Sequence, residues 1–184
     1  ALDGAQQQRV LQIFAGHPIA VELGFNAQGA KAWAHRFRTG YAALGIVPEF
    51  ICANAFAGNN VPTPEQWANF LATLRSEGGV PMTTRILPTF EYANFAPNRP
   101  TLTSNLVSQR PDFQAIIQTS GGIALDVPAG YFFAREPAYR DWVLDAIRWT
   151  HARSLLVLHI ISPHTTGEQF DEEAGMGLAH AESD

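Results

Sequence analysis

The segment that most constrains the fold of this chain is residues 121–164, which predicts a strand, a loop, a helix and a second strand. A short apolar run over 123–127 follows two glycines, and Asp126 lies near its end. Pro137 stands where a helix would begin, and the apolar residues after it recur at helical spacing. A second apolar run, 155–161, is interrupted only by His159. Such short runs on either side of a helix are typical of two parallel strands buried on both faces and joined by a right-handed crossover.

The same alternation of strand and helix recurs along the chain. After a short opening helix, strands are predicted to start near residues 19, 49, 82, 122 and 155. The clearest helix follows Thr63, because Thr63 and Gln66 suit a capping box with proline at the first helical position. We expect Pro88 to break the third strand and Pro111 to divide a helix within 103–119.

Length and composition predict an ordinary globular domain. The 184 residues suit one β/α domain over 1–164, followed by a poorly ordered acidic tail over 165–184. A net charge of −5 and a pI near 5.6 argue against a nucleic-acid surface, and no apolar run reaches the ~18 residues of a membrane span. The N-terminus lacks the pattern of a signal peptide. Cys52 has no cysteine to pair with, and we expect it to be a buried structural residue.

Two architectures fit this alternation: an incomplete (β/α)8 TIM-type barrel and a five-stranded doubly wound open sheet. The barrel is favoured by polar residues at the predicted carboxyl ends of four strands, namely Glu22, Glu91, Asp126 and His159. It is also favoured by long loops after strands and short, glycine-marked returns from helices to strands. The phosphate-binding glycine motifs of open sheets do not occur in the sequence.

Strand ends with carboxylates and loops rich in asparagine and aromatic residues resemble the first five units of a glycoside-hydrolase-type TIM barrel. The resemblance is architectural and covers roughly residues 17–164, with ALDVPAGYFF and LLVLHIISPH as its most distinctive stretches. Many such hydrolases place an acid after strand four, where this chain has Asp126 outside the usual Asn-Glu pair. They place the nucleophile on strand seven, which lies beyond the five predicted units.

Glycoside hydrolysis needs two carboxyl groups, ~5–5.5 Å apart for retention and farther apart for inversion. Glu22, Glu91 and Asp126 are the candidates, because strand alternation could turn each toward one rim, and burial would raise the pKa of a general acid. The structural alternative is a carboxylate paired with Arg85. His159 is either a further catalytic residue or a core histidine.

Sugar rings present apolar faces and hydroxyl edges, which aromatic rings and amides can bind. The predicted substrate-binding residues are Asn26, Asn54, Tyr92, Asn94, Tyr131 and His164. Glu22, Asp126, His159 and His164 could instead bind a divalent metal, although their spacing matches no metal motif.

The leading functional prediction is a carbohydrate-active hydrolase, or a fragment of one, that needs no cofactor and acts on a small-molecule or glycan ligand. One alternative is a non-catalytic protein of the same fold that binds carbohydrate or pairs with itself as a homodimer to cover open strand edges. Another is a metal-dependent sugar isomerase. A secreted or periplasmic location is slightly favoured over a cytoplasmic one.

Overall fold

The computed structural model describes residues 4–24, 29–54, 61–90, 106–128 and 137–162. In chain order its elements are α1 (Gly4–Phe14), β1 (Ala20–Gly24), α2 (Ala30–Thr39), η1 (Ala42–Leu44), β2 (Phe50–Asn54), α3 (Pro64–Ser76), β3 (Arg85–Phe90), η4 (Val107–Gln109), α4 (Pro111–Ser120), β4 (Gly122–Pro128), α6 (Pro137–His151) and β5 (Leu156–Ser162). The predicted opening helix and the five predicted strands are confirmed. The tail predicted over 165–184 lies outside the described residues.

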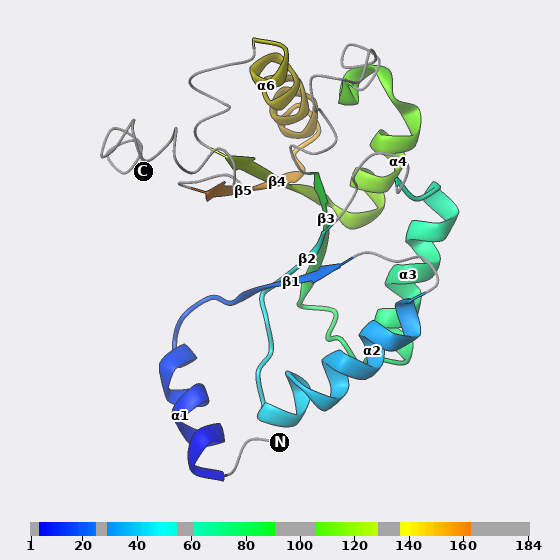
Figure 1. Cartoon of the computed structure of the whole chain (residues 1–184). Helices are drawn as coiled ribbons and strands as arrows, with labels where there is room; N and C mark the ends of the chain where they lie inside the picture. The colour runs from blue at the N-terminus through cyan, green and yellow to red at the C-terminus, as the bar shows by residue number, and fades with distance from the viewer. Residues whose placement is uncertain (1–3, 25–28, 55–60, 91–105, 129–136, 163–184) are drawn as a thin grey trace, which may run out of the picture.

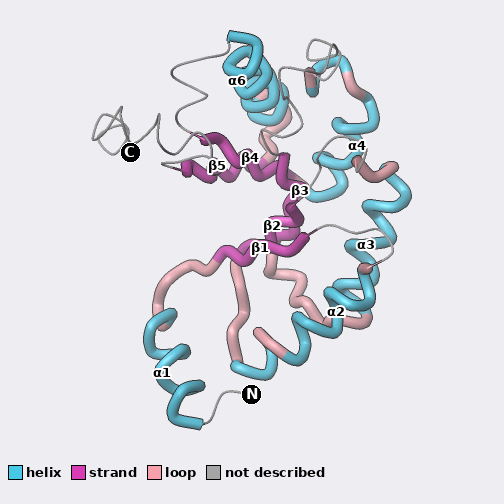
Figure 2. Tube along the Cα trace, in the orientation of Figure 1, coloured by secondary structure: helices cyan, strands magenta, loops and turns pink. Residues whose placement is uncertain are grey.

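The five strands form one parallel sheet in the order β1-β2-β3-β4-β5. The predicted α/β class with parallel strands is therefore confirmed. Among the described residues the sheet is open, and β1 and β5 are its two edges. Figure 1 shows α2, α3 and α4 on one side of the strands, α6 above them, and α1 apart at the lower left. Figure 2 shows the same layers, with the helices in cyan around a curled band of strands in magenta.

The main core lies between one face of the sheet and the helices α2, α3, α4 and α6. Alternate strand residues, such as Ile51 on β2 and Ile123 on β4, point into it, because successive side chains of a strand face opposite ways. The largest fully buried side chains include Trp67 of α3 and Trp142 of α6. Burial of this apolar face is what holds the helices against the sheet.

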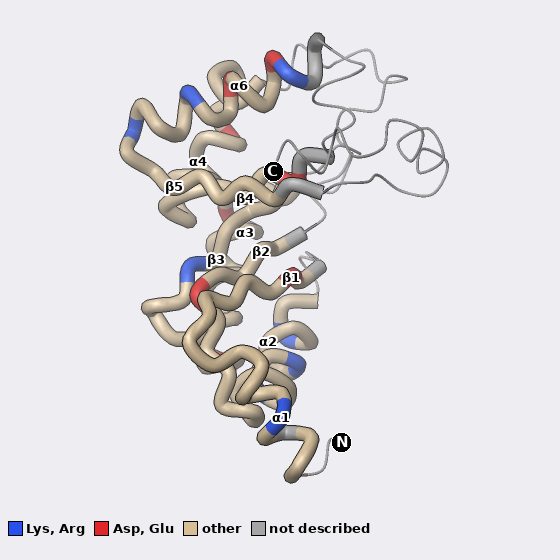
Figure 3. The backbone as a smooth tube through the Cα atoms, turned by 90° about the vertical axis from the view of Figure 1, so that its left-hand side faces the viewer, with Lys and Arg blue, Asp and Glu red and all other residues tan. Residues whose placement is uncertain are grey.

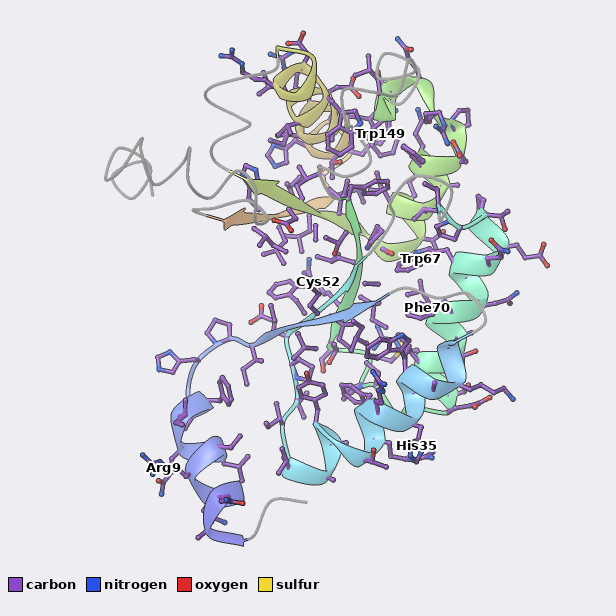
Figure 4. All side chains as sticks on the ribbon, viewed as in Figure 1. Arg9, His35, Cys52, Trp67, Phe70 and Trp149 are labelled. Carbon is purple, nitrogen blue, oxygen red and sulfur yellow. The ribbon has the colours of Figure 1, made fainter. Side chains whose placement is uncertain are left out.

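A second, smaller cluster lies on the opposite face of the sheet, which we call the concave face. Its buried members are Cys52 on β2, Leu87 on β3 and Ala124 on β4, and half-buried side chains of β5 pack against them. Figure 4 shows Cys52 on the side of the strands away from Trp67 and Phe70 of α3. Four helices cover the other face. The concave face is therefore the one whose side chains could line a site at the strand ends.

The predicted capping box begins α3. Thr63 Oγ1 accepts a hydrogen bond from the Gln66 backbone N–H at 3.1 Å, and Gln66 Oε1 accepts one from the Thr63 N–H at 2.8 Å. Farther along the helix, Trp67 Nε1 donates to Ser120 Oγ of α4 at 2.9 Å. The cap therefore fixes where α3 starts, and the indole bond ties it to the next helix.

Two expectations about proline are wrong. β3 continues through Pro88, which pairs with Ala53 of β2, because a strand tolerates proline where its missing N–H is not needed by the ladder. Pro111 does not divide a helix but begins one: it occupies the first position of α4, after the separate turn η4. Proline is favoured there because the first helical N–H has no partner within the helix.

No helix in the described part of the chain is both long and apolar enough to span a membrane.

Candidate functional site

Besides Arg85 at the amino end of β3, four described polar residues lie on the concave face, one on each of the first four strands. Glu22 pairs with Cys52, while Thr89 pairs with Ala124, two residues before Asp126. Cys52 pairs with Leu87, which lies two residues before Thr89 on β3. From β2 to β3, and again from β3 to β4, the polar residue therefore lies two positions closer to the carboxyl end of its strand. The four residues Glu22, Cys52, Thr89 and Asp126 therefore form a diagonal row across the sheet, which we call the polar row.

Asp126 is a half-buried carboxyl group in this row, and its Oδ1 atom is buried. Burial raises its pKa, and the negative charge of Glu22 raises it further. Three strand spacings would separate the two residues by at least about 14 Å on a flat sheet. That Glu22 still acts on Asp126 agrees with the curl of the sheet seen in Figure 1, which turns β1 and β4 toward a shared space.

Cys52 is buried, and its pKa is raised to about 11, first by burial and then by the charge of Glu22. The side chain of Thr89 opposes this rise. At neutral pH the group is therefore a thiol, which is a poor nucleophile and a poor metal ligand. The prediction that Cys52 is a buried structural residue is confirmed.

Thr89 was not among the predicted site residues. Its side chain is only 1% exposed, and its hydroxyl lowers the pKa of the Cys52 thiol through a side-chain hydrogen bond. The sequence contained one signal: Thr89 lies two residues after Leu87 and therefore faces the same way in a strand whose other residues, apart from Arg85, are apolar. A polar residue at such a position calls for a partner.

His159 lies on the other face of the sheet. It pairs with Leu125, which belongs to the helix-covered core, whereas Asp126 pairs with Ile160 on the concave face. Its ring is exposed overall, although partial burial lowers its pKa. The expectation that His159 joins Glu22 and Asp126 is therefore wrong, because a shift of one position along a strand reverses the direction of the side chain. Its alternative role as a buried core histidine is also wrong.

Arg85 does not neutralise either carboxylate. It is the first residue of β3, at the amino end of the strand, and no ion pair joins it to an acid within the described ranges. Figure 3 shows the charged residues along the chain. Apart from Arg85, the five strands contain no lysine or arginine. Arg85 faces the same way as Leu87 and Thr89, so the concave face has one basic strand residue, at the amino end of β3.

Several predicted residues lie outside the described part of the chain and stay predictions: Asn26, Glu91, Tyr92, Asn94, Tyr131 and His164. Asn54 is the last residue of β2, but its side chain also lies outside the description. The described residues contain no group of three or more His, Cys, Asp or Glu side chains that could hold a metal ion. His159 would in any case be separated by the sheet from Glu22 and Asp126.

A hollow of about 550 Å³ lies at the amino ends of the strands, lined by residues 16–19, 47–49 and Thr83. These residues precede β1, β2 and β3, so the hollow is at the edge of the sheet opposite to the strand ends where β/α proteins place their sites. It contains no member of the polar row, and we do not assign it to the candidate site.

No protein-family model matches this chain, and no curated protein matches it. The five-stranded parallel sheet is consistent with part of a β/α fold, and no family match supports a glycoside-hydrolase identity.

Proposed function

We propose that this protein is a carbohydrate-active hydrolase in which Asp126 is the general acid and Glu22 a second carboxylate. The observation that supports the proposal is the raised pKa of Asp126 on a concave face that it shares with Glu22. Paired carboxyl groups in unlike surroundings, one buried and one exposed, are the arrangement from which acid and base roles arise. Asp126 is half-buried and Glu22 is exposed.

In this reaction the proton of Asp126 passes to the glycosidic oxygen as the bond between that oxygen and the anomeric carbon breaks. A water molecule adds to the anomeric carbon, and its proton passes to a carboxylate on the other side of the bond. Glu22 takes this second role in our proposal. Glu91, which follows the last residue of β3 in the sequence, is the other predicted carboxylate. A raised pKa suits Asp126 to its role, because an acid must still hold its proton near the working pH.

The test is hydrolysis of a panel of plant, bacterial and fungal glycans by the purified chain. We expect Asp126→Asn and Glu22→Gln each to lower kcat by about 10²-fold or more, since general acid–base catalysis contributes about that much. The matched controls are Asp141→Asn, on an exposed position of α6, and Glu49→Gln, exposed at the amino end of β2.

These controls should leave the rate unchanged. The basic limb of the pH–rate profile should also report the Asp126 pKa. The proposal is wrong if no glycan is hydrolysed, or if both site variants retain wild-type rates on a glycan that is.

A specific feature of β5 favours a second candidate function, self-association through the open strand edges. Leu156, Val157, Leu158 and Ile160 are only half-buried, although a parallel strand that is apolar on both faces is typical of a sheet interior. A second copy placing its β1 beside this β5 would cover them, and a two-fold axis along the strands would make both such contacts equivalent. Sedimentation tests this: a dimer has twice the 20.1 kDa of one chain, and a 20.1 kDa species at every concentration excludes the pairing.

A further inference from the structure

The large apolar side chains that stay exposed in the described part of the chain gather in one region. They are Ile13 and Phe14 of α1, Val47 before β2 and Met82 before β3, which are exposed by 61%, 43%, 59% and 82%. Val47 is part of the lining of the hollow at the amino ends of the strands, and the other three lie within three residues of that lining in the sequence. We call these four side chains and the hollow the amino-end patch. Single exposed apolar residues are ordinary, whereas several gathered in one place mark a binding surface.

The helix α1 is only partly packed against the rest of the chain. It has 11 residues, and Figure 1 shows it apart from the helices that cover the sheet. A helix this short is not stable by itself and depends on packing of its apolar side. Val10 and Leu11 are half-buried, but Ile13 and Phe14 at the end of the helix are exposed. A partner that covers these two side chains would therefore complete the packing of α1.

The shape of the amino-end patch suits a second copy of the same chain. In a two-fold contact both copies use the same surface, so a side chain that projects from one copy can enter the hollow of the other, and the reverse. The hollow of about 550 Å³ is within the size range of small-molecule pockets, which is room for a side chain such as Phe14 or Met82. Because these side chains already stand at its rim, a second copy brings the apolar groups that the hollow can take up.

The charges of the patch favour the same partner. Glu49 and His17 both line the hollow, and both are exposed. A strongly acidic partner would meet the like charge of Glu49, and a strongly basic one would meet His17 in its protonated form. In a two-fold contact, Glu49 of one copy can instead face the partner's His17, which places an acceptor opposite a donor on both sides of the axis.

We infer that the amino-end patch is the surface through which two copies of this chain associate about a two-fold axis. The patch has fewer residues than the roughly 20–30 a side of a standard interface, so the dimer is weak and forms as the concentration rises. This contact differs from the pairing of β1 with β5, because it lies at the amino ends of the strands and not along the edges of the sheet. It does not depend on the proposed hydrolase activity.

The test is sedimentation velocity of the purified chain from micromolar to millimolar concentration, where we expect the 20.1 kDa monomer to convert into a dimer. Met82→Glu and Val47→Glu should each raise the dissociation constant by about tenfold or more, since each places a charge in an apolar contact. Met82→Leu, which stays apolar, should leave it unchanged. The matched control is Gln118→Glu, which adds the same charge at an exposed position of α4 outside the patch and should also leave it unchanged.

Both substituted side chains are more than half exposed, so the variants should keep the fold, which circular dichroism checks. If a variant does not fold, the methyl NMR signal of Met82 in the wild type decides, because it should shift as the concentration rises. A wild type that stays a monomer throughout, with an unchanged Met82 signal, overturns the inference. A dimer that both glutamate variants leave intact also overturns it, since such a dimer uses another surface, such as the edges β1 and β5.

Discussion

Replacing Gly122 by alanine should separate β4 from β5 where their pairing begins. Gly122 is the first residue of β4 and pairs with Leu156. A Cβ atom added there would lie 2.5 Å from the Leu156 carbonyl oxygen, 2.8 Å from its Cβ and 3.1 Å from its carbonyl carbon. Two of these contacts are with backbone atoms, which cannot move aside without moving β5. The strand that carries Asp126 would therefore lose its ladder to β5 at this end.

The magnitude follows from two opposing effects. Overpacking of a well-packed site costs about 1–3 kcal/mol, and contact with backbone puts Gly122 at the upper end. Alanine returns about 0.4–1 kcal/mol by reducing the freedom of the unfolded chain. We expect a net loss of about 2 kcal/mol in the free energy of unfolding, which for a chain of this size lowers Tm by about 4–8 °C.

The adjacent Gly121 provides the control. It has φ +71°, and nothing lies within 4 Å of an added Cβ, so alanine there meets backbone strain without a clash. That strain costs about 1–2 kcal/mol, offset by the same entropic gain, which leaves a net loss of about 1 kcal/mol. Urea denaturation measures both variants, and hydrogen exchange should accelerate in β5 only for Gly122→Ala. The reasoning is refuted if Gly122→Ala lies within about 0.5 kcal/mol of wild type or is the milder of the two.

Three further predictions concern single groups. Thr63→Ala should cost about 1 kcal/mol in urea denaturation, because Thr63 Oγ1 no longer accepts from the Gln66 N–H; an unchanged midpoint would contradict this role of the cap. With a pKa of about 11, only about one Cys52 in 10³ is a thiolate at pH 8, so a thiol reagent should label the native protein far more slowly than the urea-unfolded chain; equal rates would be inconsistent with burial. Because the pKa of Asp126 is raised on folding, the folded state binds more protons than the unfolded state between the unfolded value of about 3.9 and the folded one. Stability should therefore fall as pH rises through that window, and Asp126→Asn should remove this part of the fall; parallel stability curves for the two proteins would show that Asp126 contributes nothing to it.

Local patterns in the sequence were sufficient to predict the elements of the fold. The capping box at Thr63 sets the start of α3, because its two hydrogen bonds join residues three apart and depend on nothing distant. The errors at Pro88 and Pro111 have the opposite origin. Whether a proline breaks an element depends on which N–H the neighbouring strand or helix turn needs, and that is known only once the neighbours are in place.

The candidate site was only partly predictable. Glu22 and Asp126 were identified because acids near the ends of apolar strands are conspicuous. Thr89 was missed, since nothing in the sequence distinguishes its buried hydroxyl, which interacts with Cys52, from that of Thr84, which donates to a carbonyl oxygen 36 positions earlier in the chain. Hydrogen-bond satisfaction of a buried group is a property of the packed structure.

What the sequence determined by itself is the order and type of the elements, because apolar periodicity, caps and glycine stops act over a few residues. What only the tertiary structure decided is which face each strand residue occupies and which residues meet across strands. Register sets this, and register arises from packing of the whole sheet against its helices. Had β4 and β5 each been shifted by one position, His159 would lie on the concave face and Asp126 would face the helical core. In the observed register Asp126 pairs with Ile160 and belongs to the polar row.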